Sequence, residues 1–567
     1  MARRSCPVGL RFSALPCSRT LKRHPNRRGT LLVIVLVVVV LLTLAAANYS
    51  AWMTTELEAT SIAASDVQAR MLADSGADYV ATILASRGEV GTENLQHNPG
   101  MFLGVGVVDG DSPRARGRFT VIAPVEQDET STQVRYGLMD ESAKLNLNLL
   151  DKLALEDEES RNLLMGLPGM TEDIADAIRD WIDADDTSRE NGAETDYYES
   201  QSVPYSAKNG PLETIDELLL VRDVTPELLY GEDANRNGLL DPNENDGEAS
   251  PPLDNADGVL QLGWVSFLTT VSKEANLRAD GTAKINVNNG ILSDLYDQLE
   301  EEFDEEVAKF IVAFRMGGPK DQPPSETDTD ATAASSSTRQ QQEAQQQQLV
   351  QGAATAVAGA VLNPGGSVTR GGMDLAAGAK YQIKSLWELI DPNTSRTDAT
   401  VNGAKTELKS PWSADGGDLT SLLPEIMDKL STTGDTYLEG RININQARRE
   451  ILIGLPDITE NTVSGILAAQ SVDGEPSSDA LAQHATTGWL YTEGLVDIWG
   501  MRAIDPFITA RGSVFRAQIL GFFEGGGPVS RQEIVVDTTK VPPRIVFHRD
   551  LDDLGRGYTR TQIFPAQ

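Results

Sequence analysis

Cysteine and histidine are nearly absent from this chain of 567 residues. Its two cysteines, Cys6 and Cys17, both lie within residues 1–28, and it has only four histidines. A chain that lost this leader would have no cysteine, which excludes disulfides, thiolate nucleophiles and cysteine-bound metals. So few histidines also argue against a histidine-rich zinc site. A structural metal would have to be a hard cation held by oxygen atoms, and calcium fits that description.

The short motifs of common enzymes are absent as well. The sequence contains no Gly-x-Ser-x-Gly, no phosphate-binding glycine loop and no His-Glu-x-x-His, so it offers none of the sites that these motifs build. Acidic residues are so frequent that pairs of carboxylates do not indicate glycosidase chemistry. We therefore expect a protein that is not an enzyme.

Positive charge is scarce beyond the N-terminus. The chain has 48 basic and 84 acidic residues, and residues 1–28 hold eight of the basic residues and none of the acidic ones. The remainder has 40 basic against 84 acidic residues, a net charge of −44. A surface of this sign repels nucleic acid and anionic lipid, and it suits an extracytoplasmic setting. We expect no nucleic acid as a partner.

A short apolar run follows the basic leader. Leu31 to Ala47 is a stretch of 17 residues in which only Thr43 is polar, at the lower limit for a helix that spans a bilayer. The basic leader places the N-terminus in the cytoplasm. Three interpretations compete: an uncleaved anchor, a secretory signal cleaved after Ala47, and cleavage after Gly29 with the apolar run retained.

Two features favour cleavage after Gly29. No proline occurs between Pro25 and Pro99, which is unusual for a signal followed by a loop. Apolar residues also recur beyond the membrane at nearly helical spacing, so the sequence predicts one helix from about residue 30 to about residue 86. These residues are Met53, Leu57, Val67, Met71, Leu72, Val80, Ile83 and Leu84.

Two strand-rich regions enclose a long, mostly helical stretch. The alternation of apolar residues predicts strands at 118–123 and 133–138, around an acidic turn at 126–129, and again at 513–523, 531–536 and 544–548. We predict an α+β fold in which one long N-terminal helix and an antiparallel sheet carry a large inserted α domain. The expected domains are a leader (1–29), a helix (30–90), a first β part (91–139), the insertion (140–505) and a C-terminal β part (506–567).

The insertion contains an internal repeat. A basic residue, an aliphatic residue, Asn, an aliphatic residue and Asn occur at 144–148, 284–288 and 441–445, giving repeats near 140–222, 281–392 and 438–500. We expect the Asn side chains to cap helices or to bond the neighbouring backbone. A low-complexity segment at 317–372 interrupts the second repeat, and its composition predicts disorder.

The repeats also resemble helix-hairpin-helix units, which in other proteins bind DNA phosphate through backbone N–H groups. Gly-Leu-Pro turns at 166–168 and 454–456 mark two of the hairpins. Acidic residues flank both turns, where DNA-binding units carry Lys or Arg. This pattern opposes DNA binding.

Residues 233–244 match the twelve-residue calcium loop position by position. Oxygen ligands fall at positions 1, 3, 5 and 9, glycine at position 6, an aliphatic residue at position 8 and glutamate at position 12. The alternative is a polar turn that matches by chance in an acidic chain. The expected ligands are Asp233, Asn235, Asn237, the carbonyl of Leu239, Asp241 and Glu244.

A second acidic cluster begins at Asp180 and continues to Glu194. Carboxylates of this density repel one another unless a cation or an arginine neutralises them, so the cluster is a second candidate calcium site. A solvated acidic loop is the alternative. The candidate ligands are Asp183, Asp185, Asp186, Glu190 and Glu194.

Several blocks resemble one family, the minor pseudopilin protein K of the type II secretion system (general secretion pathway protein K). Together they cover about 30–300 and the chain from about 440 to its end. The sequence is longer than the common pattern of this family because of the low-complexity insert, the third Asn-x-Asn copy and the loop at 233–244. The blocks are Arg-Arg-Gly before the apolar helix, residues 69–77, 140–148, 180–185 with 192–194, 209–211 with 217–218, and 284–288.

The resemblance implies that prepilin peptidase cleaves between Gly29 and Thr30, and that Thr30 becomes the new N-terminus. Most pilin-like proteins have a glutamate five residues into the mature chain, where Ile34 stands here. Family members that lack this glutamate cap the fibre, where an unpaired carboxylate would be buried at a cost. The implied partners are other minor pseudopilins and the peptidase. Family members can also bind calcium in their α domain.

The resemblance therefore implies a tip subunit of the secretion pseudopilus, anchored in the inner membrane by one helix with its C-terminal bulk in the periplasm. The alternative is an anchored or secreted calcium-dependent adhesin or hydrolase. That alternative predicts cleavage after Ala47 and no binding to minor pseudopilins.

Overall fold

A computed structural model describes residues 28–86, 95–124, 134–150, 157–320, 368–391, 393–414, 416–470 and 484–564. The chain divides into two compact units, Met1–Ser65 and Asp66–Gln567. Each unit is described by itself. The acidic turn expected at 126–129 and most of the low-complexity segment lie outside the described residues.

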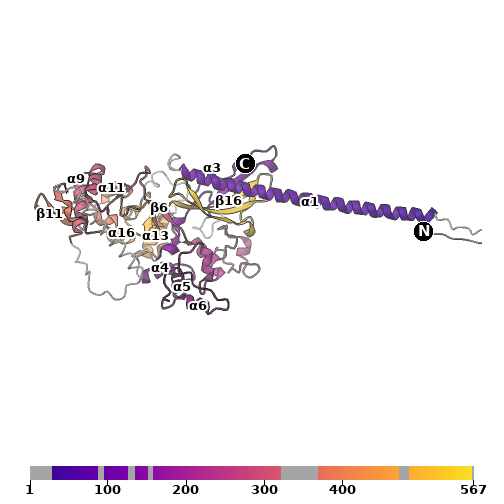
Figure 1. The fold of residues 1–567 in the computed structure, drawn as a ribbon, viewed down its shortest axis with the longest axis horizontal. Helices are drawn as coiled ribbons and strands as arrows, with labels where there is room; N and C mark the ends of the chain where they lie inside the picture. The colour runs from indigo at the N-terminus through magenta and orange to yellow at the C-terminus, as the bar shows by residue number, and fades with distance from the viewer. Residues whose placement is uncertain are drawn as a thin grey trace, which may run out of the picture. The chain divides into compact units, whose positions relative to one another are not determined.

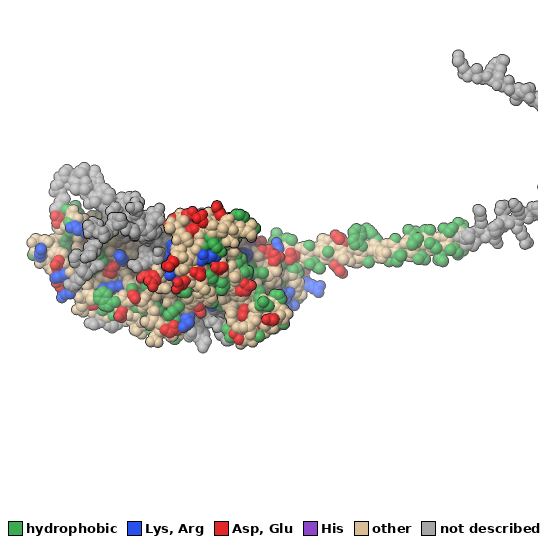
Figure 2. Space-filling model, turned by 90° about the horizontal axis from the view of Figure 1, so that it is seen from below, with side chains coloured by type: hydrophobic (Ala, Val, Ile, Leu, Met, Phe, Trp, Pro, Cys, Tyr) green, Lys and Arg blue, Asp and Glu red, His purple; other side chains and the backbone are tan. Residues whose placement is uncertain are grey.

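Helix α1 (Arg28–Ala85) has 58 residues and matches the single helix expected from the sequence. Because no proline interrupts it, its backbone hydrogen bonds continue unbroken. An apolar window near its N-terminus has a mean hydropathy of 3.0 and is long enough to cross a membrane. The large apolar side chains of this part, Ile34 among them at 59% exposure, face outward, as Figure 2 shows in green. Gly29 and Thr30 lie in the first turn of α1.

One antiparallel sheet is built from both ends of the second unit. Its strand order is β1-β2-β16-β17-β18, and β3 also pairs with β16. The sequence therefore predicted correctly that a single sheet is split by an insertion (Figure 1). The strands are β1 (Val105–Val108), β2 (Gly117–Ile122), β3 (Met139–Asp140), β16 (Val514–Phe523), β17 (Ser530–Asp537) and β18 (Arg544–Asp550).

The strand expected at 133–138 is wrong in its described part. Only an isolated bridge between Ala123 and Arg135 forms there, and the backbone N–H of Leu138 donates to Leu95 instead. Leu138 is instead buried in the hydrophobic core between the end of α1 and the sheet. The apolar residues at these positions therefore alternate because of packing in that core. Tertiary contacts therefore override the local strand propensity.

The last five turns of α1, from Asp66, pack on the sheet. Ala73, Ala77, Val80 and Leu84 form a core with apolar side chains of β2, β16 and β17. Glycine permits the close approach, because a Cβ on Gly521 would lie 2.1 Å from the Ala69 carbonyl oxygen. The second unit therefore has a tightly packed helix-on-sheet core.

The insertion between β3 and β16 contains three copies of one small structural motif. In each copy a two-residue strand of the Asn-x-Asn motif pairs in parallel with a two-residue strand that lies beyond the end predicted for the repeat, so each copy is longer than the sequence indicated. Each repeat is thereby closed on itself. The pairs are β4 (Leu145–Asn146) with β5 (Leu268–Thr269), β7 (Ile285–Asn286) with β12 (Leu430–Ser431), and β14 (Ile442–Asn443) with β15 (Ile508–Thr509).

Each copy also contains a helical hairpin, and all three share one large hydrophobic core. The hairpins are α4 (Asp157–Met165) with α5 (Glu172–Ile182), α8 (Leu292–Glu302) with α9 (Glu305–Gly317), and α12 (Arg449–Leu452) with α13 (Glu460–Gln470). Further helices are α3 (Pro99–Phe102), α6 (Thr195–Glu199), α7 (Pro226–Tyr230), α11 (Gly416–Lys429), α15 (Trp489–Thr492), α16 (Ile498–Ile504) and α17 (Arg560–Ile563).

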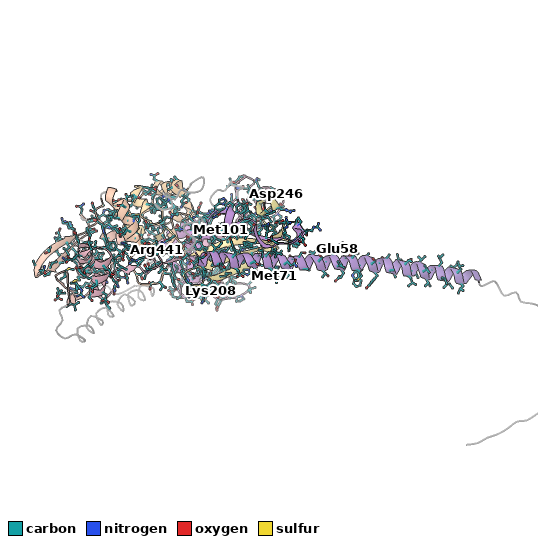
Figure 3. The ribbon with its side chains drawn as sticks, turned by 90° about the horizontal axis from the view of Figure 1, so that it is seen from above. Glu58, Met71, Met101, Lys208, Asp246 and Arg441 are labelled. Carbon is teal, nitrogen blue, oxygen red and sulfur yellow. The ribbon has the colours of Figure 1, made fainter. Side chains whose placement is uncertain are left out.

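The remaining strands lie within the insertion. Strands β8 to β11 form a small antiparallel sheet in the second copy, and β6 pairs with β13. Arg441, labelled in Figure 3, begins the motif of the third copy. These strands are β6 (Lys273–Ala275), β8 (Thr369–Arg370), β9 (Met373–Asp374), β10 (Arg396–Val401), β11 (Ala404–Lys409) and β13 (Tyr437–Glu439).

Candidate calcium sites and the repeat motifs

The second asparagine of each motif joins three segments of its own repeat. Asn148 Nδ2 donates to the carbonyls of Leu212 (2.9 Å) and Thr270 (3.1 Å), and its Oδ1 accepts from Leu212 N (2.6 Å). Asn288 bonds Ile383 and Thr432 in the same way. A short side chain with two donors and an acceptor is required for this bridge. The expectation that these asparagines bond the backbone is confirmed.

The third copy repeats the bridge with one change. Asn445 Nδ2 donates to the carbonyls of His484 (2.8 Å) and Ala510 (2.9 Å), but its Oδ1 accepts from Trp489 Nε1 (2.9 Å). In all three copies the first asparagine accepts from the backbone N–H two residues later. These asparagines hold the fold and are not exposed for binding.

The Gly-Leu-Pro turns of the first and third copies pack against each other's hairpins. A Cβ on Gly166 would lie 2.1 Å from the carbonyl oxygen of Glu450, and a Cβ on Gly454 would lie 2.9 Å from the Cα of Leu163. The N–H groups that follow these glycines bond within their own turns, Leu167 to Leu164 and Leu455 to Leu452. The two turns therefore serve the packing of the first hairpin on the third.

The loop at 233–244 folds back on itself through its acidic residues. Asp233 accepts from the backbone N–H groups of Asn237 (3.0 Å) and Gly238 (2.9 Å). Glu244 closes the loop by accepting from Ala234 N (3.2 Å) and Asp241 N (3.0 Å). Gly238 has φ +69°, the left-handed conformation that the sixth position of a calcium loop needs.

Five of the six expected ligands are drawn together by hydrogen bonds. Asp241 Oδ2 accepts from the side-chain amides of Asn235 (2.6 Å) and Asn237 (2.9 Å). Leu239 packs its side chain in a small core with residues of β2 and β16. The loop follows the short helix α7 and itself ends in a single turn of 3-10 helix at Pro242–Glu244, so no long helix flanks it directly on either side.

Electrostatics in this loop favour a cation. Glu244 is 1% exposed. Its burial, with the nearby carboxylates of Asp233 and Asp241, raises its pKa to about 7. A divalent cation would relieve both the desolvation and the repulsion. The oxygen-rich donor set fits calcium, and Asp233, Asn235, Asn237, Asp241 and Glu244 would hold it.

The same loop is attached to the sheet. Arg531 of β17 donates to the carbonyls of Asn235 (2.8 Å) and Arg236 (2.6 Å). Gln518 of β16 also donates to Arg236 O (2.7 Å), and the Tyr558 hydroxyl donates to Asn237 O (3.0 Å). A cation here would stabilise the contact between insertion and sheet.

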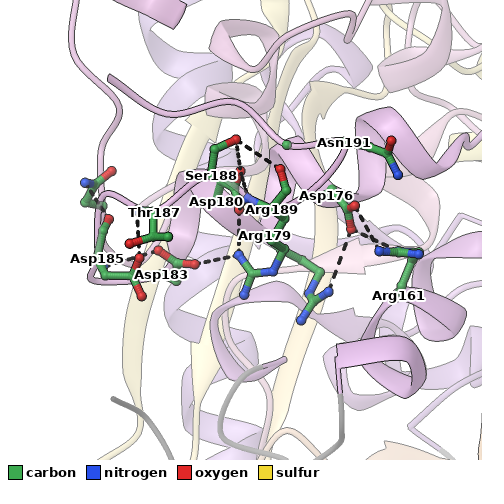
Figure 4. A network of polar contacts seen from close by, with 12 residues as sticks. Arg161, Asp176, Arg179, Asp180, Asp183, Asp185, Thr187, Ser188, Arg189 and Asn191 are labelled. Carbon is green, nitrogen blue, oxygen red and sulfur yellow. Dashed lines mark hydrogen bonds and ion pairs between the residues drawn. The ribbon is translucent and has the colours of Figure 1, made fainter. Parts of the chain in front are cut away.

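The second acidic cluster centres on the end of α5. Carboxylate oxygens of Asp180, Asp183 and Glu194 lie within 4.8 Å of one another. Arg189 Nη1 lies 2.7 Å from Asp180 Oδ1 and 2.6 Å from Asp183 Oδ2 (Figure 4). One arginine thus neutralises part of the cluster, as the sequence argument required.

Glu194 is the residue that this arginine leaves unsatisfied. Both of its carboxylate oxygens are buried and have no hydrogen-bond partner among the described residues. Burial, together with Asp180 and Asp183, raises its pKa to about 8. A buried carboxylate without a donor costs free energy, and a calcium ion would supply the missing partner.

The remaining candidates lie outside this group of three. Asp185, Asp186 and Glu190 are exposed, and Asp185 Oδ1 accepts from Thr187 N at 2.8 Å. Asp180 was not among the expected ligands. Its spacing of three residues from Asp183, at the last turn of an amphipathic helix, is the signal that could have found it.

Comparison with known proteins bears on this part of the chain. Residues 143–230 match the family described as "Type II secretion system (T2SS), protein K". This part of the chain is similar to the type II secretion system protein K family. The match includes the first Asn-x-Asn motif and the cluster of Asp180, Asp183 and Glu194, and it ends just before the loop at 233–244.

Two curated relatives agree with this assignment. The chain is 44% identical over 57 residues to type II secretion system protein K of Pectobacterium carotovorum subsp. carotovorum, covering 10% of this chain and 17% of the relative. It is 31% identical over 113 residues to the putative type II secretion system protein K of Escherichia coli (strain K12), covering 18% and 35%. The matched regions span about a sixth and about a third of these relatives.

A solved structure, the GspK-GspI-GspJ complex of the enterotoxigenic Escherichia coli type 2 secretion system, also aligns with this chain. The alignment has a TM-score of 0.32 and 12% sequence identity, and it covers 88% of this chain and 98% of the other.

Proposed function

We propose that this protein is a minor pseudopilin at the tip of the type II secretion pseudopilus, where it supports protein secretion across the outer membrane. The observation that carries the proposal is one continuous helix, α1, whose apolar start follows Arg27-Arg28-Gly29 directly and whose end packs on a sheet split by a protein K insertion. Its role is structural and not enzymatic.

The position within the fibre follows from Ile34. Five residues after Gly29, a carboxylate would pair with the N-terminal amine of a neighbouring subunit. Ile34 has no such group, and an apolar residue at the end of the fibre avoids a buried unpaired charge. The insertion, with its own large core, supplies bulk that suits a cap. Other minor pseudopilins and prepilin peptidase are the partners that this role requires.

Calcium belongs to the same proposal as a structural ion. The loop at 233–244 and the cluster of Asp180, Asp183 and Glu194 both hold buried glutamates with raised pKa values. An ion at either site would stabilise the insertion without taking part in chemistry. In this arrangement the protein is a single-pass inner-membrane protein with its bulk in the periplasm.

The mature N-terminus tests the proposal. The full chain, expressed with prepilin peptidase, is purified from membranes, and its N-terminal peptide is identified by mass spectrometry. We expect a chain that starts at Thr30, and a Gly29→Val variant that stays uncut. A wild-type chain that starts at Asn48, or that keeps Met1, would overturn the proposal in favour of a secreted or simply anchored protein.

A further inference from the structure

The antiparallel sheet of the second unit has two unlike faces. Its first face packs against α1 through Ala517, Ile519, Ile534 and Val536. Because successive side chains of a strand point to opposite faces, the residues between these lie on the second face. That second face carries charged and polar side chains from three strands: Arg516, Gln518, Arg531, Glu533, Asp537 and Arg549. The sheet is therefore apolar toward α1 and rich in charge on its other side.

The insertion covers this charged face without sharing a large hydrophobic core with it. The core of the insertion includes no residue of β16, β17 or β18, and of its described residues only Leu239 joins a core of the sheet. A cavity of 260 Å³ lies in between, lined by Lys144 and Asp216 of the insertion and by Val535 and Phe547 of the sheet. Interfaces within a chain that are this polar allow the two parts to move relative to each other.

Ion pairs close this interface between insertion and sheet. Lys273 Nζ of the insertion lies 2.9 Å from Asp537 Oδ2 of β17. Asp216 of the insertion pairs with Arg549 of β18, and the two side chains are 25% and 29% exposed. Water can solvate such charges when they separate, so they resist separation less than a packed hydrophobic core does.

The chain passes between sheet and insertion at two places that lie side by side. It leaves the sheet at Asp140, which pairs with Phe515 of β16. It returns through Gly512, where an added Cβ would lie 1.9 Å from Asp140 Oδ1. Glu141 and Arg516 also pair at this place. Hinges consist of a few residues at the ends of elements, so the two crossings together can serve as one hinge.

The loop at 233–244 contacts the sheet far from these crossings. Strand β17 ends at Asp537, beside the crossing that leads into β16. Arg531 lies six residues earlier on β17, about 20 Å away at the rise of a β-strand. There it donates to the carbonyls of Asn235 and Arg236. Since a contact far from a hinge must separate even for a small rotation, this loop controls whether the interface can open.

We infer that the insertion turns away from the charged face of the sheet about Asp140 and Gly512, and that the loop at 233–244 is the latch that holds it closed. Opening exposes Val535, while α1 stays packed on the other face of the sheet. Loss of a cation from the loop weakens the latch. This last step rests on the proposed calcium site, whereas the hinge itself does not.

Thiol labelling of the folded full chain tests the hinge. In a chain with Cys6→Ser and Cys17→Ser, one cysteine replaces Val535 or Val536, which are 1% and 0% exposed on opposite faces of β17. Cysteine packs as a small apolar residue, so both variants should melt at the wild-type temperature. With chelator and a bulky maleimide, Val535→Cys should react at least about tenfold faster than Val536→Cys, because local opening requires less free energy than global unfolding. Calcium should slow the labelling of Val535→Cys.

Removal of one ion pair tests what holds the interface closed. Asp216→Asn, which breaks the pair with Arg549, should raise the labelling rate of Val535→Cys by about threefold or more and leave that of Val536→Cys unchanged. The matched control is Asp297→Asn, which breaks an exposed pair with Arg370 inside the insertion. That control should change neither labelling rate.

The outcomes separate the hinge from the other proposals. Equal labelling rates at Val535→Cys and Val536→Cys would show that only global unfolding exposes the interface, and a faster rate at Val536→Cys would show that α1 leaves the sheet instead. Either result overturns the hinge. If Val535→Cys reacts faster but calcium does not slow it, the hinge stands and the calcium-dependent latch is wrong. The place of this protein in the pseudopilus is tested separately, by its mature N-terminus.

Discussion

At the scale of single residues, the junction between sheet and insertion depends on a buried ion cluster. Glu141 accepts from Arg516 of β16 through two nitrogens, one of them at 3.2 Å, and Arg516 also contacts Glu533 at 3.1 Å. Burial alone would raise the pKa of Glu141, but Arg516 and Lys144 hold it below its usual value. The carboxylate is therefore ionised in the folded protein.

Arg516→Met should destabilise the protein by about 3–5 kcal/mol, because it leaves Glu141 buried without its cation. Glu141 has a lowered pKa, so it contributes stability above its unfolded pKa that is lost as pH falls through the folded value. The variant should lose this stabilisation at neutral pH and match the wild type more closely in acid. Urea denaturation at several pH values measures both effects.

The control is Arg449→Met, which removes an exposed pair with Glu460 and should cost less than about 1 kcal/mol. Equal losses in the two variants would show that the buried cluster has no special role.

At Glu194 we expect the stability of the folded protein to depend on pH in the opposite sense. Its folded pKa of about 8 lies above its ordinary value of 4.5. The stability that depends on its proton is therefore present below about pH 4.5 and is lost as pH rises toward 8. Without metal, Glu194→Gln should be more stable than the wild type at pH 8, by about 1–3 kcal/mol. Calcium should reduce that difference, since it satisfies the carboxylate.

Thermal melting with chelator and with calcium, at pH 5 and pH 8, checks this expectation. Glu190→Gln, an exposed carboxylate of the same loop, is the matched control and should show neither effect. A Glu194→Gln variant that melts lower than the wild type in chelator at pH 8 would contradict the assignment.

At the scale of elements, the repeats show which strands a sequence pattern can predict and which it cannot. The three Asn-x-Asn motifs were visible because five neighbouring residues recur together. Their partner strands β5, β12 and β15 were not, because each has only two residues, an aliphatic one followed by Thr or Ser. So short a segment carries no periodicity. Each of these strands pairs with its Asn-x-Asn strand because the fold brings the chain back beside the motif.

Gly166→Ala tests the contact between the first and third hairpins. The added Cβ would meet the backbone of Glu450, which cannot rotate away, so we expect a loss of about 1–3 kcal/mol in unfolding free energy. Gly210→Ala is the control, since its nearest neighbour would be 3.7 Å away. Chemical denaturation of both variants gives the comparison. Indistinguishable denaturation curves for the two variants would show that the first and third hairpins move apart at little cost in free energy.

At the scale of the whole second unit, the loop at 233–244 connects the two halves of the fold. It belongs to the insertion, yet Arg531 and Gln518 of the sheet bind its backbone. Loss of a cation from this loop would therefore loosen the insertion on the sheet, and the effect would reach residues far from the ligands.

Glu244→Ala should remove the response of this loop to calcium. Calcium at a hundred times its dissociation constant would stabilise the wild type by about 2.7 kcal/mol, and the variant should lose this gain. In chelator the two proteins should melt closer together. Hydrogen exchange of β17 amides, with and without calcium, measures whether calcium binding at the loop protects the sheet.

The control for this prediction is Glu248→Ala, which changes an exposed acidic residue nearby. A full calcium response in Glu244→Ala would reject the site.

The sequence by itself determined the long helix, the split sheet, the repeats and the calcium-type loop. Each of these depends on local composition or on a pattern that recurs within a few residues: the missing prolines, the apolar alternation, and Asp, Asn and Gly at set positions. The family model for protein K likewise matches a continuous part of the sequence, residues 143–230.

The tertiary structure decided the rest. It brought Glu194 to Asp180 and Asp183, placed Arg189 between the two aspartates, and attached the loop at 233–244 to Arg531. These contacts join residues that no local pattern relates. They exist because folding returns the chain, after an insertion of several hundred residues, to the sheet from which it departed.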